Sequence, residues 1–281
     1  MKDITITSLE TITAFGVTSG EYLFTLDELQ NASVAQSQET TEITGKAGRK
    51  LSTLKRNKAV TISGANGLVS GGLLEMQVGT NFELQKATKV MWTDYITVKA
   101  GETAGTLADI KTAYTAVGTA GAEIVGLYIR NTDGTLGTKY TQKASATKAG
   151  EFSYAPATKT LSFYENQGAI ADTAIKAGTE LVAFYQRNIT ADVLTNRSDA
   201  YSQKCSLYID ALGEDKCANV YRVQFYIPKA DFNGEFTFEM GDNQTVHNFE
   251  AEALSGACGT SGEFFTYTVF GADTEDTPVT P

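Results

Sequence analysis

The sequence predicts a mainly β protein, either a β-sandwich or a half-open barrel, with one short α-helix and an elaborated middle region. Three observations favour this fold. The 281 residues include 39 Thr, 14 Phe and 13 Tyr, and these residue types suit a pleated, half-buried surface. Apolar and polar side chains alternate with a period of two in many short segments. Long segments with a 3.6-residue apolar period are scarce.

Alternation and turn residues place the expected strands in order along the chain. From the N-terminus they are expected at residues 4–6, 22–26, 59–63, 95–99, 123–130, 160–164, 181–187, 206–209, 247–253 and 264–270, with a hairpin at 219–240. The pair Asp133-Gly134 is a turn signal between two of these strands. Two short amphipathic turns are expected at residues 106–113 and 189–198.

The expected hairpin at residues 219–240 has a regular pattern in both strands. The first strand, YRVQFYIP, alternates apolar and polar side chains and is expected to end at Pro228. An Asn-Gly pair supplies the turn. The second strand, GEFTFEMG, directs its apolar side chains inward and its acids, Glu235 and Glu239, outward.

One segment carries the signals of a helix. Ser70 is a favourable N-cap for the segment GGLLEMQV that follows it. Gly79 comes directly after this segment, where a left-handed conformation commonly ends a helix. The sequence therefore predicts a short helix between Ser70 and Gly79.

The chain reads as one domain. It has no Pro- or Ser-rich linker and no clear internal repeat, so residues 1–271 are expected to form a single β domain. Residues 100–180 are richer in Ala, Gly and Thr and are a possible insertion. Residues 272–281, ADTEDTPVTP, are acidic and contain Pro, and they are expected to form a mobile tail.

The charges are distributed unevenly. The formal net charge is −10, yet residues 46–58 contain six cations and no acid, which leaves −16 on the rest of the chain. The segment is either a solvated loop and strand or an electrostatic dock for an acidic surface, on a partner or on another copy of the protein. Its cations are Lys46, Arg49, Lys50, Lys55, Arg56 and Lys58.

Composition argues against several classes of function. An acidic chain repels phosphate over most of its surface, so sequence-specific nucleic-acid binding is not expected. One His and three Cys without knuckle spacing leave little for zinc sites or catalytic triads, and no catalytic, cofactor-binding or metal residue is assigned. A lone His247 on a strand is expected to be packed or exposed. Cys205 and Cys217 either pair or are separate thiols. No signal peptide or membrane insertion is expected.

The order of segments resembles the major tail tube protein of long-tailed bacteriophages. A strand-rich N-terminus is followed by a polar loop with a basic stretch, TTEITGKAGRKLSTLKRNKAVTISG, and then by a helix opening, SGGLLEMQVGT. The chain closes with IPKADFNGEFTFEMGDNQTVHNFEAEAL and GEFFTYTVFG. The similarity covers most of the chain, and residues 100–180 match least.

This resemblance implies a structural protein of the virion tail without enzymatic activity or cofactor. Hexameric rings of subunits are expected to stack into a hollow tube around a tape-measure protein, contact tail-end proteins, and later conduct DNA. Assembly is expected in the cytoplasm of the host bacterium. The six cations become candidates for a subunit interface. The candidates for an acidic lumen wall are Glu235, Glu239, Glu250 and Glu252.

Other readings remain open from the sequence. A capsid decoration or head-fibre protein shares the Thr-rich β composition. A carbohydrate-binding β-sandwich module requires exposed aromatic platforms, and a glycoside-active enzyme requires two carboxylates that meet only in the folded chain.

Overall fold

The computed structural model describes residues 3–102, 106–166, 169–170, 175–238, 246–255 and 262–271. The chain forms two compact units, the first from residues 1–82 and 194–281 and the second from residues 83–193. The possible insertion at residues 100–180 falls within the second unit. The expected tail at residues 272–281 lies outside the described residues.

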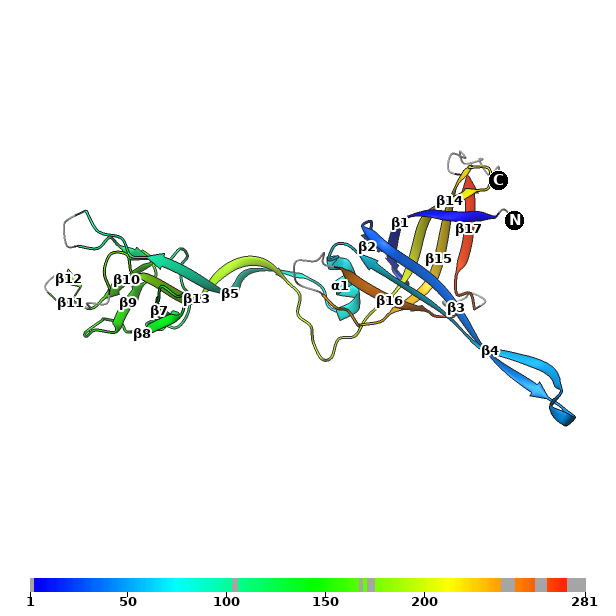
Figure 1. Cartoon of the computed structure of the whole chain (residues 1–281), viewed down its shortest axis with the longest axis horizontal. Helices are drawn as coiled ribbons and strands as arrows, with labels where there is room; N and C mark the ends of the chain where they lie inside the picture. The colour runs from blue at the N-terminus through cyan, green and yellow to red at the C-terminus, as the bar shows by residue number, and fades with distance from the viewer. Residues whose placement is uncertain are drawn as a thin grey trace. The chain divides into compact units, whose positions relative to one another are not determined.

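The first unit is built on one eight-stranded antiparallel sheet, in the order β2-β1-β14-β15-β16-β4-β3, with β17 also paired to β15 (Figure 1). Its elements are β1 (Ile4–Gly16), β2 (Tyr22–Leu26), β3 (Leu29–Thr44), the 3₁₀ turn η1 (Lys46–Gly48), β4 (Lys50–Asn66), α1 (Gly71–Val78), β14 (Lys204–Asp215), β15 (Val220–Phe232), β16 (His247–Ala253) and β17 (Thr266–Gly271). The expectation of a mainly β fold with one short α-helix is confirmed for the described residues.

The core of the first unit follows from the alternation of its strands. In β16 every second side chain is buried, and the same period places Ile12, Ile62 and Leu207 in the core. Leu73 and Met76 of α1 pack into the same cluster. Each such side chain contributes roughly 1.5–3 kcal/mol of burial free energy, so this cluster is what holds the sheet and helix together.

Helix α1 begins and ends where the sequence predicted. The Ser70 hydroxyl accepts a hydrogen bond from the Leu73 amide at 3.3 Å, which satisfies one of the free donors of the first turn. Gly79 adopts φ 77°, and its amide donates to the Glu75 carbonyl. A Cβ at position 79 would lie 1.9 Å from the Tyr201 carbonyl oxygen, so both conformation and space require glycine here.

The expectation of a hairpin at residues 219–240 is wrong. Strand β15 continues through Pro228 to Phe232, and residues 233–238 are not a strand. Between the register pairs Cys205–Ala230 and Leu207–Ile227, two residues of β15, Pro228 and Lys229, lie opposite one residue of β14, which is a bulge that accommodates Pro228. On its other side β15 pairs with β17 up to Tyr226 and with β16 only from Ala230, so no neighbour requires the amide that proline lacks.

Three further expectations about local structure are also wrong. Residues 106–113 form no amphipathic turn but contribute the short strand β6, and residues 189–193 belong to a long strand rather than to a turn. The polar loop before residue 59 is a strand, because β4 already begins at Lys50.

The second unit holds a seven-stranded sheet in the order β5-β13-β7-β8-β9-β10-β6. Among the strand pairs described in this unit, β8 and β9 alone are parallel. Its elements are β5 (Glu83–Thr97), β6 (Ile110–Lys111), β7 (Ile124–Arg130), β8 (Leu136–Gln142), β9 (Glu151–Ala155), β10 (Thr160–Phe163) and β13 (Glu180–Val193), with β11 (Glu165–Asn166) and β12 (Ala169–Ile170) as a separate pair. The core contains edge-to-face rings of Tyr140 and Phe163 with centroids 5.2 Å apart.

Candidate assembly surfaces

The predicted basic segment lies on a projecting hairpin of the first unit. Strand β4 pairs with β16 only over residues 60–66, and over residues 50–58 it pairs with β3 alone. We call residues 37–58 the hairpin arm, and Figure 1 shows it extending past the rest of its sheet. All its residues are exposed apart from Gly45 in the turn and Thr53, which are half-buried.

The arm brings the six predicted cations together. Lys46 lies in the turn η1, Arg49 follows it, and the other four lie along β4. The facing strand β3 supplies only two carboxylates. Glu42 pairs with Lys50, and Glu39 accepts a hydrogen bond from Asn57 at 2.6 Å. Four net positive charges therefore remain on an exposed surface.

Apolar side chains accompany these charges. Ile43, Leu51 and Leu54 on the arm are 47%, 66% and 47% exposed. A two-stranded hairpin without a packed face is only marginally stable in water. Exposed apolar groups rimmed by charges are typical of a surface that binds a partner.

Two of the acidic candidates, Glu250 and Glu252, lie on β16, which borders β4 on the side away from β3. Glu250 and Glu252 occupy the exposed face of β16, and each is the register partner of a hydroxyl residue of β4. Asp231 of β15 pairs with Glu252 in register and forms an ion pair with Lys204 at 3.4 Å. These carboxylates form a polar face opposite the core.

Glu235 also lies near β16, although it is not part of a strand. It is exposed in the irregular segment after β15, and its amide donates to the Asn233 side chain. The Asn233 amide donates to the Glu250 carbonyl at 2.8 Å, which holds this segment beside β16. Glu239 lies outside the described residues. The structure thus brings three of the four acidic candidates onto neighbouring segments, although not on the predicted strand.

The first sheet also has a surface hollow that the sequence did not predict. It measures about 740 Å³ and opens over β1, β14 and β15. Its floor contains the ring of Tyr208, whose centroid lies 5.6 Å from that of Phe15 and 4.6 Å from that of Tyr226. Burial and the neighbouring Tyr226 raise the pKa of Tyr208. We call it the aromatic hollow, and its principal lining residues are Phe15, Tyr208, Asp210, Gln224, Tyr226 and Glu263.

His247 is structural. It is fully buried, and its Nδ1 accepts a hydrogen bond from the Ser70 amide at 3.3 Å. This tautomer leaves the proton on Nε2, which donates to the Gln77 side-chain oxygen at 2.8 Å. Burial lowers the pKa of His247. The imidazole therefore ties β16 to both ends of α1 as a neutral ring.

Both described cysteines are free, Cys205 in the core and Cys217 exposed, so they do not pair. Burial, and to a lesser extent the charge of Asp231, raises the pKa of Cys205 to about 12. A thiol with so high a pKa is unreactive at neutral pH.

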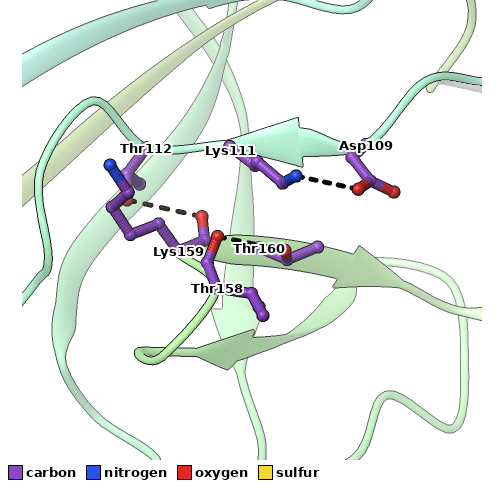
Figure 2. A network of polar contacts seen from close by, with 6 residues as sticks. All are labelled: Asp109, Lys111, Thr112, Thr158, Lys159 and Thr160. Atoms are coloured by element: carbon purple, nitrogen blue, oxygen red, sulfur yellow. Dashed lines mark hydrogen bonds and ion pairs between the residues drawn. The ribbon is translucent and has the colours of Figure 1, made fainter.

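Polar contacts in the second unit join its strands and turns. Figure 2 shows the Asp109–Lys111 ion pair at 2.9 Å and the Thr112 hydroxyl bonded to the Lys159 carbonyl. The Thr160 hydroxyl donates to the Thr158 carbonyl in the adjacent turn. These contacts are exposed or bonded to the backbone, which fits a role in holding β6 against the turn between β9 and β10.

A second cluster in this unit surrounds Tyr185. Its hydroxyl donates to Asp94 at 3.2 Å and accepts from the Tyr114 amide at 3.1 Å. Burial, followed by the Asp94 charge, raises the pKa of Tyr185 to about 12. The guanidinium carbon of Arg187 lies 3.7 Å from the Tyr114 ring centroid and 4.2 Å from that of Trp92. This cluster attaches the segment around Tyr114 to the sheet.

Over the described ranges, no three His, Cys, Asp or Glu residues are grouped to hold a metal ion. The helices in the same ranges are too short to cross a membrane, since α1 has eight residues.

Comparison with known protein families gives a match that covers nearly the whole chain. A family model described as the YomU/Tube protein family matches residues 4–266. No curated protein matches the sequence of the chain.

Proposed function

This chain belongs to the YomU/Tube protein family, a family of phage-associated tube proteins, and we propose that it is the non-enzymatic subunit of a bacteriophage tail tube. In this proposal hexameric rings stack into a conduit for DNA. The match over residues 4–266 carries the proposal. It agrees with the resemblance on which the tail tube was predicted.

The open edges of the first sheet support ring formation. Among the described strands of this unit, β2 and β3 end the strand order on either side. Unpaired edges invite pairing with another chain, and a closed ring lets each copy cover the edge of the next. The hairpin arm supports stacking, because its cations and exposed apolar side chains offer a head-to-tail contact to an acidic surface on the next ring.

The acidic face of β16 supports a role in the lumen. A wall that DNA must pass cannot hold phosphates tightly, and carboxylates repel them. We assign Glu250, Glu252 and the neighbouring Glu235 to this wall, and Glu239 by its place in the sequence.

The remaining assignments follow from the same proposal. The tube encloses a tape-measure protein, contacts tail-end proteins, and belongs to the tail of the virion after assembly in the host bacterial cytoplasm. The first unit is the tail-tube-like domain. The second unit, residues 83–193, is an insertion that separates its two halves in the sequence.

Electron microscopy of the purified protein tests the proposal. We expect rings and tubes of uniform diameter, whereas a capsid decoration or head-fibre protein gives monomers or short trimers. Sedimentation at low and high salt is the companion measurement. Because attraction between exposed charges is screened beyond about 8 Å at physiological ionic strength, stacking should weaken as salt rises. A protein that stays monomeric at every concentration and ionic strength contradicts the proposal.

A further inference from the structure

The tip of the hairpin arm has a defined shape. The turn η1 contains two residues with positive φ, Ala47 at 63° and Gly48 at 73°. Leu51 packs against Gly45, where an added Cβ would lie 2.7 Å from the Leu51 Cδ1 atom. The Gly45 amide donates to the Arg49 carbonyl at 2.7 Å and closes the loop. The tip, residues 45–51, therefore presents Lys46, Arg49, Lys50 and Leu51 on a compact turn.

The aromatic hollow has the complementary chemistry. Its floor is formed by aromatic rings, and the residues described around it include the carboxylates Asp210 and Glu263 but no cation. Asp210 is half-buried and accepts a hydrogen bond from Gln224 at 2.8 Å, which holds one of its oxygens in place. Aromatic faces attract ammonium and guanidinium groups and also pack against leucine. Carboxylates at the same place add charge-assisted hydrogen bonds.

The hollow of a chain is not filled by its own arm. Strands β15 and β16 separate β4 from β14 and β1 in the sheet order. The arm leaves the sheet where β4 loses its pairing with β16, at Val60. A contact between arm and hollow is therefore a contact between two copies of the chain.

We propose that the aromatic hollow of one subunit receives the tip of the hairpin arm of a second copy. This inference rests on the proposed tube function and names the two surfaces that meet. The contact joins unlike surfaces, so each copy offers one arm and one hollow. Such head-to-tail contacts propagate from copy to copy, as a stack of rings requires.

Cross-linking between two proteins that each carry one introduced cysteine, with Cys205 retained in the core, tests the contact. One protein carries Lys46→Cys at the tip, and the other carries Val17→Cys at the hollow, where Val17 is exposed. Both also carry Cys217→Ser and Cys258→Ser, and Cys205 stays in the core. One of the two proteins bears a size tag, and the mixture is assembled and treated with a short bis-maleimide.

We expect a mixed dimer as the main product of this pair. The matched control replaces Val17→Cys by Leu68→Cys, which is also exposed in the first unit but lies outside the hollow. Tubes that form normally but cross-link equally well through Leu68→Cys, or not at all through Val17→Cys, overturn the inference and leave the tube function standing. A protein that forms neither rings nor tubes overturns both.

A second measurement uses the charges. Asp210→Asn with Glu263→Gln keeps the shape of the hollow and removes its carboxylates. We expect the yield of the Lys46→Cys and Val17→Cys product to fall about tenfold at low salt, and less at high salt where the attraction is already screened. An unchanged yield at low salt contradicts the electrostatic part of the inference.

Discussion

The two halves of strand β4 share a partner in β3 but differ in what lies on their other side. Residues 60–66 are flanked by β16, and Val60 and Ile62 are fully buried there. Residues 50–58 have no second neighbour among the described strands, and nearly all their side chains are exposed. Residues 60–66 contribute to the stability of the subunit, and residues 50–58 are available to a partner. Substitutions in the two halves should therefore affect different measurements.

The largest expected effect is on folding. Ile62→Ala removes a fully buried side chain and leaves a cavity, so the free energy of unfolding should fall by about 2–5 kcal/mol. Leu54→Ala on the arm should change it by only about 0.5 kcal/mol. Urea denaturation of both variants measures the difference. Equal losses would show that the arm is part of the cooperative fold.

Charge reversal on the arm should affect assembly and not folding. Lys55→Glu with Arg56→Glu should leave circular dichroism and thermal unfolding unchanged but impair tube formation, because each subunit around a ring repeats the same repulsion. The control pair Lys143→Glu with Lys148→Glu makes the same change of charge on exposed residues of the second unit. Micrographs in which only the arm variant lacks tubes support the assignment. Normal tubes from the arm variant would remove these two residues from the interface.

Acid should weaken the region around β16 and α1 through His247. Burial holds the folded pKa of His247 below its ordinary 6.5, so the unfolded chain binds the proton first as pH falls. The stabilising contribution is complete above about pH 6.5 and is lost as pH falls through the folded pKa.

Unfolding measured between about pH 7 and pH 5 should therefore show a steeper loss for the natural chain than for His247→Gln, which does not titrate. Lys55→Glu, on the arm, should keep the slope of the natural chain. A parallel pH dependence of the natural chain and His247→Gln argues against protonation at this site.

The smallest expected effect in purified protein concerns the acidic face. Glu250→Lys with Glu252→Lys should fold and form tubes, because both side chains are exposed on the face opposite the core. The tubes should retain a double-stranded oligonucleotide more strongly, and phage carrying the variant should infect poorly.

The matched control for this prediction is Asp27→Lys with Glu28→Lys, two exposed acids between β2 and β3. Retention that rises equally in the control would show a general effect of charge rather than a lumen position. Unimpaired infectivity of the β16 variant would refute the lumen assignment.

Local signals in the sequence were sufficient for several elements. The residues of β2 and β16 coincide with the expected strands, since alternation has a period that any half-buried strand must follow. The caps of α1 were predictable because Ser70 and Gly79 act on backbone groups within a few residues. The six cations were recognisable as a group because they are adjacent in the sequence.

The tertiary structure decided what depends on distant partners. The arm exists because residues 37–44 find residues 50–58 across a turn, and an exposed polar strand has no apolar alternation by which to predict it. Strand β15 continues through Pro228 because β16 and β17 leave that position unpaired. The residues near Pro228 in the sequence do not reveal this. The aromatic hollow gathers Phe15, Tyr208 and Tyr226 from β1, β14 and β15, which are neighbours in the sheet although residues 17–203 separate β1 from β14 in the chain. Surfaces of this kind are set by long-range pairing, because strands that are far apart in the sequence become neighbours only when the sheet closes around its core.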